Sequence, residues 1–419
     1  MEHVKIYPEE YSRPLRVLMG ILAQANVNFF DNNQSWFTRY WKYFYLIPFL
    51  IVHFVSMSTS ILAELMAGRD LYGFLSLPVF IITIQAVIKI IIILSNKRQL
   101  EHIIDELGQL WRTEGLNKKQ QSVKKAKARE MRIGVIAYLR FPFFVSFQYT
   151  LLPLLEAVFN VVRGRSAEWR LPFSAEFGFD VNSHWSLYAV TYAYQVYFIL
   201  LTSCVYLGTD FLTIALSAHL SREFLLLRQD LTNIQPTRVA SDNNSRGRIL
   251  GFVRSHQKII RFAASQMKMR KRESVCIYFR LAQKLDEAIN KLTFINVLFT
   301  TVNVSFFGLS VLASKRTTDR LTNVTIVLTV LMLILIQCYF GEKLKTGSED
   351  IFQAACENQW YEGDIEYQKF LYFIMLRSQK PCYLTSLTFT KITLETFTKV
   401  LSTTWSYFSL VNTMYQRQK

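Results

Sequence analysis

The sequence lacks the motifs that carry most enzyme chemistry. Its 419 residues contain no H-E-x-x-H, no G-x-S-x-G, no phosphate-binding P-loop and no G-x-G-x-x-G. The six histidines are dispersed, and the five cysteines form neither a C-x-x-C pair nor a zinc-type spacing. We therefore predict that the chain is not an enzyme and holds no metal and no cofactor.

Charge is also scarce, and it is unbalanced. Charged residues make up 19% of the chain, against about 25% in a soluble domain. The net charge of +17 raises the possibility of a nucleic-acid partner. However, the basic residues lie between apolar blocks, which is typical of cytoplasmic loops in a membrane protein, so we predict no nucleic-acid binding. Residues 1–40 contain no signal-peptide core, so the first apolar block is expected to serve as the insertion signal.

The abundant residues are apolar, and they are gathered into blocks. Hydrophobic residues make up 51% of the chain and aromatic residues 15%. Runs of about 20 apolar residues match the thickness of a bilayer. We predict an all-α polytopic membrane protein whose seven transmembrane helices lie in the lipid bilayer, at residues 43–65, 71–95, 133–161, 187–217, 292–313, 321–341 and 392–415.

The connectors between these blocks predict the orientation. The connectors at 96–132 and 222–291 are long and basic, which places them in the cytoplasm. The connectors at 66–70, 163–185 and 314–320 then lie outside. The N-terminus is therefore expected in the cytoplasm and the C-terminus outside the cell. A G-protein-coupled receptor has the opposite orientation, and its D-R-Y-like and N-P-x-x-Y motifs are absent here.

Three ionisable residues fall within the blocks. For Asp210 we favour a structural hydrogen-bonding role over ion coordination, and for His53 a partnered interior position. Lys89 is expected to reach the membrane interface with its side chain. Beyond the fourth and sixth blocks, residues 217–231 and 342–363 have apolar positions at helical spacing, so we expect packed helical extensions there, with Trp360 included in the packing.

The last block carries a polar stripe along its whole length. At about 100° per residue, seven polar side chains share an arc of about 80°: Lys391, Glu395, Thr398, Ser402, Ser406, Ser409 and Thr413. Such a stripe is consistent with a hydrated ion path or with helix–helix packing. One helix cannot enclose a pore, so pore lining requires an oligomer.

The C-terminal third resembles the insect odorant receptor family. The resemblance rests on QCYFGEKLKTGSEDIFQAACENQWYEGD at 337–364 and on MLRSQKPCYLTSLTFTKITLETFTKVLSTTWSYFSL at 375–410. Within them, Ser348, Ile351 and Trp360 follow the family's Y-F/Y-G element. Residues 171–195 are similar to the family's second extracellular loop.

The resemblance implies one subunit of a tetrameric, ligand-gated, non-selective cation channel. The chain is expected to be the odorant-tuning subunit, paired with the shared odorant co-receptor in the plasma membrane of the olfactory sensory dendrite. A small volatile, mostly apolar odorant is the expected ligand. We divide the chain into residues 1–217 with the ligand pocket, 218–391 with the cytoplasmic anchor and helices five and six, and the pore-lining helix at 392–419.

The resemblance also places the two sites. The odorant is expected between the outer halves of the helices, near Phe74, Leu77, Phe80, Phe147, Tyr149, Leu152, Tyr188, Tyr192 and Val196. The pore and gate are expected at Ser402, Ser406, Ser409, Val411, Asn412 and Thr413. Asn412 is poorly suited to closing a pore by dewetting, so apolar residues of the co-receptor are expected to complete the seal.

One segment departs from the family pattern. Residues 264–281, which include Cys276, separate two stretches that the family joins directly. We expect either a flexible cytoplasmic loop or the product of a retained intron.

Two other functions compete with this interpretation. The first is a homomeric gustatory-type channel, whose T-Y-h-h-h-x-Q-F ending is replaced here by SYFSLVNTMYQ at 406–416. The second is a secondary transporter, which requires inverted repeats and helices broken at the midplane. Neither feature is evident in the sequence.

Overall fold

A computed structural model describes residues 6–31, 35–66, 70–113, 116–164, 169–181, 183–233, 250–314, 316–363, 365–387 and 389–418. Within these ranges, the side chains at 70–76, 250–274, 365–366, 411 and 414–418 are left out of the description.

The described chain is almost entirely helical, which confirms the all-α class. The only strands in this part are two short ones, paired antiparallel just before the last helix. In chain order, the elements are α1 (Glu9–Gln24), α2 (Trp36–Tyr40), α3 (Tyr43–Met66), α4 (Asp70–Ser95), α5 (Lys97–Gln109), α6 (Lys118–Val162), α7 (Trp185–Asn233), α8 (Leu250–Ala313), α9 (Thr317–Glu357), the 3-10 turn η2 (Trp360–Glu362), α10 (Ile365–Ser378), β1 (Thr385–Ser386), β2 (Thr390–Lys391) and α11 (Leu394–Gln418).

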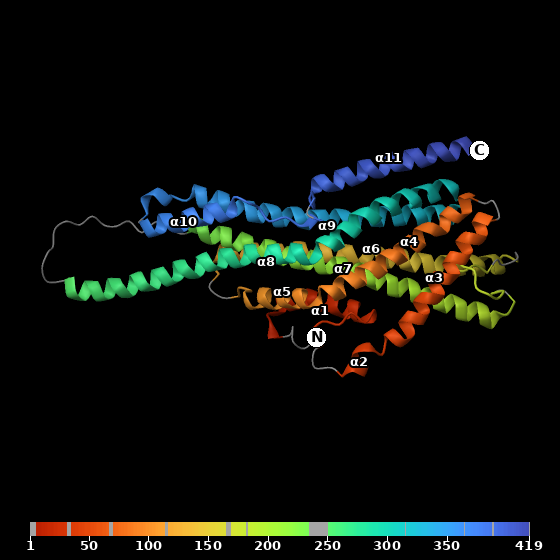
Figure 1. Ribbon diagram of the computed structural model, residues 1–419, viewed down its shortest axis with the longest axis horizontal. Helices are drawn as coiled ribbons and strands as arrows, with labels where there is room; N and C mark the ends of the chain where they lie inside the picture. The colour runs from red at the N-terminus through yellow and green to blue at the C-terminus, as the bar shows by residue number, and fades with distance from the viewer. Residues whose placement is uncertain are drawn as a thin grey trace.

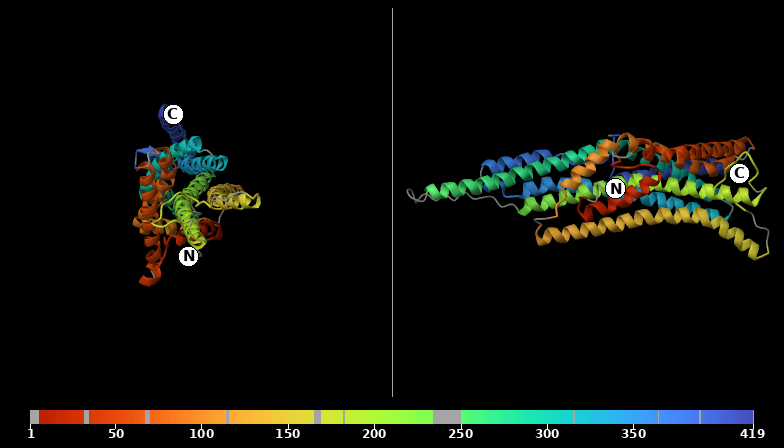
Figure 2. Two further views of the ribbon diagram at one scale, coloured as in Figure 1. Left: turned by 90° about the vertical axis from the view of Figure 1, so that its right-hand side faces the viewer. Right: turned by 90° about the horizontal axis from the view of Figure 1, so that it is seen from below.

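The long helices run side by side along the length of an elongated bundle (Figures 1 and 2). Six of the described helices are long and apolar enough to cross a membrane, namely those within Trp36–Met66, Leu77–Ser95, Lys118–Val162, Trp185–Asn233, Val275–Ala313 and Thr317–Glu357. The seventh is α11, a helix of 25 residues that is more polar than these six. All seven lie where the apolar blocks predict them.

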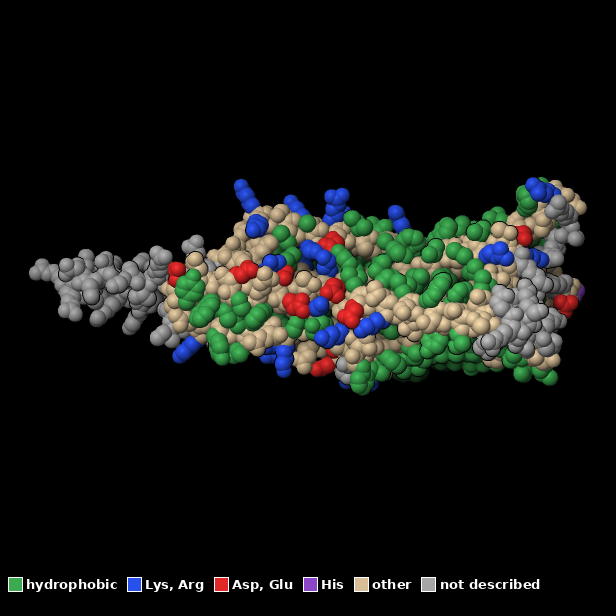
Figure 3. All heavy atoms as spheres, turned by 90° about the horizontal axis from the view of Figure 1, so that it is seen from above, with side chains coloured by type: hydrophobic (Ala, Val, Ile, Leu, Met, Phe, Trp, Pro, Cys, Tyr) green, Lys and Arg blue, Asp and Glu red, His purple; other side chains and the backbone are tan. Residues whose placement is uncertain are grey.

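Connectors of different character lie at opposite ends of the bundle. The described parts of the connectors at 96–132 and 222–291 lie toward one end of the bundle, whereas the helix ends that flank residues 66–70, 163–185 and 314–320 lie at the other end with the C-terminus (Figure 1). On the face seen in Figure 3, charged side chains gather over the end with the basic connectors and recur at the far tip, with an apolar band between them. This arrangement is consistent with an apolar band embedded in the bilayer and a basic end in the cytoplasm.

The main core lies in the basic half of the bundle. There α1, α5 and α10 surround the extensions of α7, α8 and α9, and Phe224, Phe279 and Ile351 are fully buried. The helical extensions expected after the fourth and sixth blocks are confirmed, because they continue α7 and α9 and contribute to this core. Trp360 is an exception, since it lies in η2 with 40% of its surface exposed.

The expectation of a flexible loop at residues 264–281 is wrong. The whole segment belongs to the continuous helix α8. Its last part places Val275, Tyr278 and Phe279 in the main core, at the three- and four-residue spacing of one helix face. The part of the segment from Val275 onward is thus an integral part of the core, and the intron alternative stays a prediction that a comparison of transcript with gene would test. The basic composition conceals this apolar face.

Gly341 in α9 allows a close approach of the chain that leads into α11. A Cβ atom added at this position would clash with the main-chain carbonyl oxygen of Ile392. We expect Gly341→Ala to cost about 1–3 kcal/mol of stability, because a backbone group cannot move aside as a flexible side chain can. Thermal melting of the purified chain measures this. Gly20→Ala is the control, since nothing lies within 4 Å of a Cβ there. An equal melting temperature for both variants would contradict the close approach.

Candidate functional site

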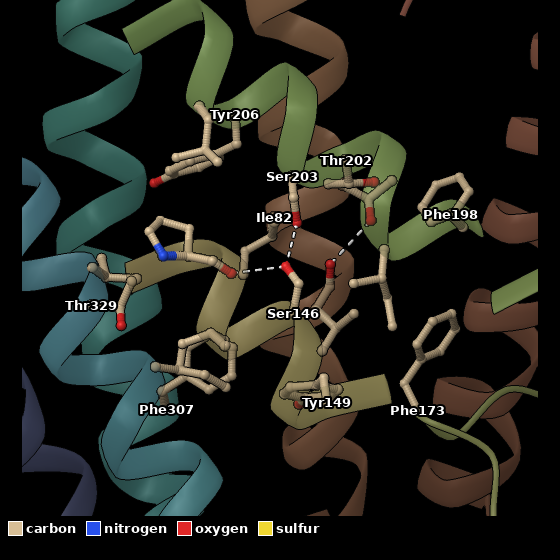
Figure 4. Close-up of a pocket in the computed structure, with 18 of the residues that line it drawn as sticks. Ile82, Ser146, Tyr149, Phe173, Phe198, Thr202, Ser203, Tyr206, Phe307 and Thr329 are labelled. Atoms are coloured by element: carbon tan, nitrogen blue, oxygen red, sulfur yellow. Dashed lines mark hydrogen bonds between the residues drawn. The ribbon is translucent and has the colours of Figure 1, made fainter. Parts of the chain in front are cut away.

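A cavity of about 150 Å³ lies between the helices in the apolar half of the bundle (Figure 4). Helices α3, α4, α6, α7, α8 and α9 all contribute to its wall, together with Phe173 from the segment that connects α6 to α7. The lining side chains are His53, Val79, Ile82, Thr83, Pro142, Val145, Ser146, Tyr149, Phe173, Phe198, Ile199, Thr202, Ser203, Tyr206, Leu207, Phe307, Ile326, Thr329, Val330 and Leu333. Most of these are aliphatic or aromatic, so the cavity suits a small apolar molecule.

Two serines give the cavity a polar point. Ser146 and Ser203 turn their hydroxyls toward one another, and the oxygens lie 2.8 Å apart (Figure 4). The Ser146 hydroxyl also donates to the carbonyl oxygen of Pro142 at 2.9 Å. A hydroxyl has one proton, so Ser203 must be the donor within the pair. What the pair can still offer a ligand is therefore an acceptor lone pair.

His53 adds a second acceptor to the wall. Its ring stacks on Phe198, with centroids 3.7 Å apart, and its Nε2 lies 3.2 Å from the hydroxyl of Thr83. That hydroxyl donates its proton to the carbonyl oxygen of Val79, so Nε2 must carry the proton in the contact with His53. In a neutral ring, Nδ1 then holds a lone pair, and Nδ1 is buried without a hydrogen-bond partner among the described residues.

Of the eight residues expected at the ligand site whose side chains the structure describes, one lines this cavity. Tyr149 lines it, whereas Leu152 lines a neighbouring, more polar cavity. Phe147 is 60% exposed on the outside of the bundle. The sequence predicts the helix but not which of its sides faces inward. It therefore does not distinguish Phe147, which lies on the outer side, from Tyr149, which lies on the inner side.

The other expected ligand residues have structural surroundings of their own. The hydroxyls of Tyr188 and Tyr192 donate to the carbonyl oxygens of Arg170 and Thr150, respectively. Phe80 packs edge-on against Phe54. Leu77 and Val196 are half-buried and lie outside the cavity lining, and the side chain of Phe74 lies outside the described residues.

Sequence reasoning missed most of the cavity wall. His53, Phe173 and Phe198 form one side of it, and Phe307 and Val330 contribute from α8 and α9. The sequence does set two of these residues apart. His53 is a histidine within an apolar block, and Phe173 lies in the stretch that is similar to the second extracellular loop of odorant receptors. For Phe198, Phe307 and Val330, nothing distinguishes them in sequence from lipid-facing neighbours.

A buried ion pair supports the cavity floor. Lys89 Nζ lies 2.9 Å from both carboxylate oxygens of Asp210, and the lysine is fully buried. Asn296 Nδ2 donates to the same carboxylate at 2.7 Å. Lys89 Nζ also lies 3.6 Å from the ring centre of Tyr206, which lines the cavity. The pair thus links α4, α7 and α8 directly beneath the ligand space.

This pair corrects the expectation for Lys89. Its side chain does not extend to the membrane interface, because this part of α4 packs against α7 and α8 inside the bundle. The structural hydrogen-bonding role expected for Asp210 agrees with its two partners.

The polar stripe of α11 faces away from the rest of the chain. The helix lies at the periphery of the bundle (Figures 1 and 2) and is packed through Thr396, Val400 and Thr404, which are buried. By contrast, the stripe residues Glu395, Thr398, Ser402, Ser406, Ser409 and Thr413 are exposed. Helix packing within the chain therefore uses another face and does not explain the stripe.

Two of the expected gate residues, Asn412 and Val411, remain. Asn412 is half-buried, and its Oδ1 has no hydrogen-bond partner in the described part of the chain. The side chain of Val411 lies outside the described residues.

Comparison with known proteins accounts for the combination of seven helices, an internal cavity and an exposed polar helix. The family model described as "7tm Odorant receptor" matches residues 73–405. The chain belongs to the odorant receptor family. This odorant receptor chain is 24% identical to odorant receptor 13a of Drosophila melanogaster over 282 residues, covering 64% of this chain and 63% of the relative. It is 23% identical to odorant receptor 85b of the same species over 322 residues, covering 72% of this chain and 75% of the relative.

The fold of the odorant receptor chain also matches a solved structure. The olfactory receptor OR5 from Machilis hrabei, in complex with eugenol, superposes with a TM-score of 0.72 at 13% sequence identity. The match covers 97% of this chain and 100% of OR5. At this identity, the likeness concerns the fold.

Proposed function

We propose that the chain is the odorant-binding subunit of a ligand-gated, non-selective cation channel, and that the cavity between α3, α4 and α6–α9 is its odorant site. The observation that carries this proposal is an apolar cavity among the membrane-spanning helices of an odorant receptor chain. Its wall is drawn from six helices, so a bound molecule contacts all of them and can shift their packing.

The cavity favours a class of odorant. A dry apolar cavity of about 150 Å³ accommodates benzene in other proteins, so a ligand of one ring or similar size fits here. The Ser146–Ser203 pair and His53 Nδ1 offer acceptors rather than donors. A small alcohol or phenol would satisfy one of them, whereas an ester or ketone would not. Aromatic walls at Tyr149 and Phe198 favour a ring that can stack.

The pore requires further subunits. The exposed stripe on α11 is consistent with a helix that faces the axis of a four-subunit channel, with its hydroxyls replacing part of the hydration shell of a permeating cation. The odorant co-receptor is the proposed partner in this heterotetramer, in the plasma membrane of the sensory dendrite. A homomeric channel of the gustatory type is the alternative.

Co-expression distinguishes these possibilities. The chain is expressed in cells with and without the co-receptor, and currents are recorded over a panel of odorants matched in size, including phenols, alcohols, esters and ketones. We expect current only with the co-receptor, and lower half-maximal concentrations for the hydroxyl-bearing odorants. Equal responses without the co-receptor would favour the homomeric channel.

Asn412 should influence the pore more than the ligand site. Replacing it with leucine makes the helix end more apolar, which favours dewetting and closure. We expect a lower single-channel conductance or altered cation selectivity, with the half-maximal odorant concentration changed less than about threefold, which is below 1 kcal/mol. Single-channel recording of the co-expressed channel measures both. A large loss of odorant potency with normal conductance would overturn this placement.

A further inference from the structure

A second cavity lies at the cytoplasmic end of the membrane-spanning region. It has a volume of about 490 Å³ and is bounded by α1, α6, α7 and α9. Three of its lining residues, Arg132, Arg222 and Lys343, lie just beyond the apolar stretches of α6, α7 and α9, respectively. The cavity therefore sits where these helices pass from hydrocarbon to the inner headgroup layer.

Its wall has two chemically different parts. The part toward the membrane is apolar and contains Val135, Ile136 and Leu139 of α6 with Phe211 and Phe340. Ile136 is 40% exposed and its neighbour Ile133 is 59% exposed, so the apolar part is continuous with the lipid-facing surface of α6. The other part is charged and carries an excess of cations.

The charged part contains five basic and three acidic side chains, namely Arg13, Lys127, Arg132, Arg222 and Lys343 with Glu9, Glu10 and Glu130. The acids already have partners. Glu10 pairs with Lys124 at 2.7 Å, Glu9 lies 4.0 Å from Arg16, and Glu130 accepts hydrogen bonds from Lys127 and Tyr339.

Two buried polar groups on α7 lack hydrogen-bond partners within the described structure. Arg222 is 5% exposed, and its Nε and Nη2 are unsatisfied. Its nearest carboxylate, Glu10, lies 3.9 Å away, which is too far for a hydrogen bond. His219 is 1% exposed, and its Nε2 is also unsatisfied.

Unsatisfied buried donors are costly, which makes these groups informative. A buried donor without a partner costs about 1–3 kcal/mol, more when it is charged, so each such group calls for an explanation, and a bound ligand, ion or water is one. The Arg222 guanidinium lies 3.6 Å from the ring centre of Trp111, which holds it in place but satisfies none of its N–H groups. The Nε and Nη2 groups form one edge of the guanidinium fork, which binds phosphate or carboxylate oxygens with two parallel hydrogen bonds.

We propose that this cavity binds an anionic phospholipid of the inner leaflet. The phosphate accepts hydrogen bonds from Arg222 and from His219 in the tautomer that carries a proton on Nε2. Arg13, Arg132 and Lys343 add positive charge along the rim, and one acyl chain lies along the α6 wall toward the bilayer. A lipid is favoured over a soluble phosphate because half of the wall is apolar and open to the membrane.

The test uses the purified full-length chain in nanodiscs. Its melting temperature is compared between phosphatidylcholine alone and phosphatidylcholine containing phosphatidylinositol bisphosphate. We expect the anionic lipid to raise the melting temperature by several degrees, and the double variant Arg13→Gln/Lys343→Gln to lose at least half of this rise. These rim residues are less buried than Arg222, so the variant is expected to fold.

The double variant Lys119→Gln/Lys125→Gln provides the matched control, because it also removes two positive charges. Both lysines are exposed on α6 outside the cavity lining, so the variant leaves the site intact, and the full rise is expected. An equal loss in the control would show non-specific attraction and overturn the proposal. A full rise with soluble inositol trisphosphate in phosphatidylcholine nanodiscs would overturn the lipid as the source, and no rise with the anionic lipid would overturn the site.

Discussion

Replacing Lys89 by methionine is expected to destabilise the chain by about 3–5 kcal/mol, because it leaves a carboxylate buried without its countercharge. Of the two donors to Asp210 described above, Lys89 and Asn296, only the amide of Asn296 would remain. The loss is an uncompensated buried charge rather than the attraction between the two ions. The double variant Lys89→Met/Asp210→Asn removes both charges and should therefore recover most of the lost stability.

Thermal melting of the detergent-solubilised chain and its amount at the cell surface measure this effect. Lys284→Met is the matched control, because Lys284 pairs with Glu106 at 3.0 Å but both side chains are partly exposed. Such a pair contributes about 0–1 kcal/mol, so the control should melt close to wild type. If Lys89→Met also melts near wild type, or if the double variant is no more stable than the single one, the buried pair does not have the role described.

Replacing Ser203 by leucine should raise the half-maximal odorant concentration by about 10–200-fold. The larger side chain occupies part of a cavity of only about 150 Å³, and steric misfit of this kind in an apolar pocket costs about 1–3 kcal/mol. The acceptor that the Ser146–Ser203 pair offers is also changed. Ser203→Ala separates the two causes, because it removes the hydroxyl without filling space, and it should weaken only odorants that bear a hydroxyl, by several-fold.

Odorant dose–response curves of the co-expressed channel provide the measurement. Ser186→Leu is the control, since it makes the same change on the same helix at an exposed position. The surface amount of each variant is recorded alongside, so that a loss of folding is not mistaken for a loss of affinity. Unchanged potency in Ser203→Leu at normal surface amount would place the odorant site elsewhere.

Sequence patterns sufficed for the long-range organisation of this chain. Apolar blocks long enough to cross a bilayer predict helices wherever they occur, because unpaired backbone groups are too costly in hydrocarbon. The seven helices therefore lie where they are expected, and the described parts of the basic connectors lie toward one end of the bundle. The stripe on α11 was also readable, because a periodicity in one helix needs no knowledge of its neighbours.

The sides of the helices were decided only by the tertiary structure. In a membrane protein, lipid-facing and bundle-facing side chains are both apolar, so hydropathy does not distinguish Phe147 from Phe198. The ion pair between Lys89 and Asp210 exists only because α4 packs against α7, and the sequence does not show which helices are neighbours. Likewise, the basic composition of residues 264–281 concealed an apolar helix face. The sequence by itself determined the helices and their order along the chain, whereas the cavity, the ion pair beneath it and the unsatisfied groups at the cytoplasmic end arise only where several helices converge.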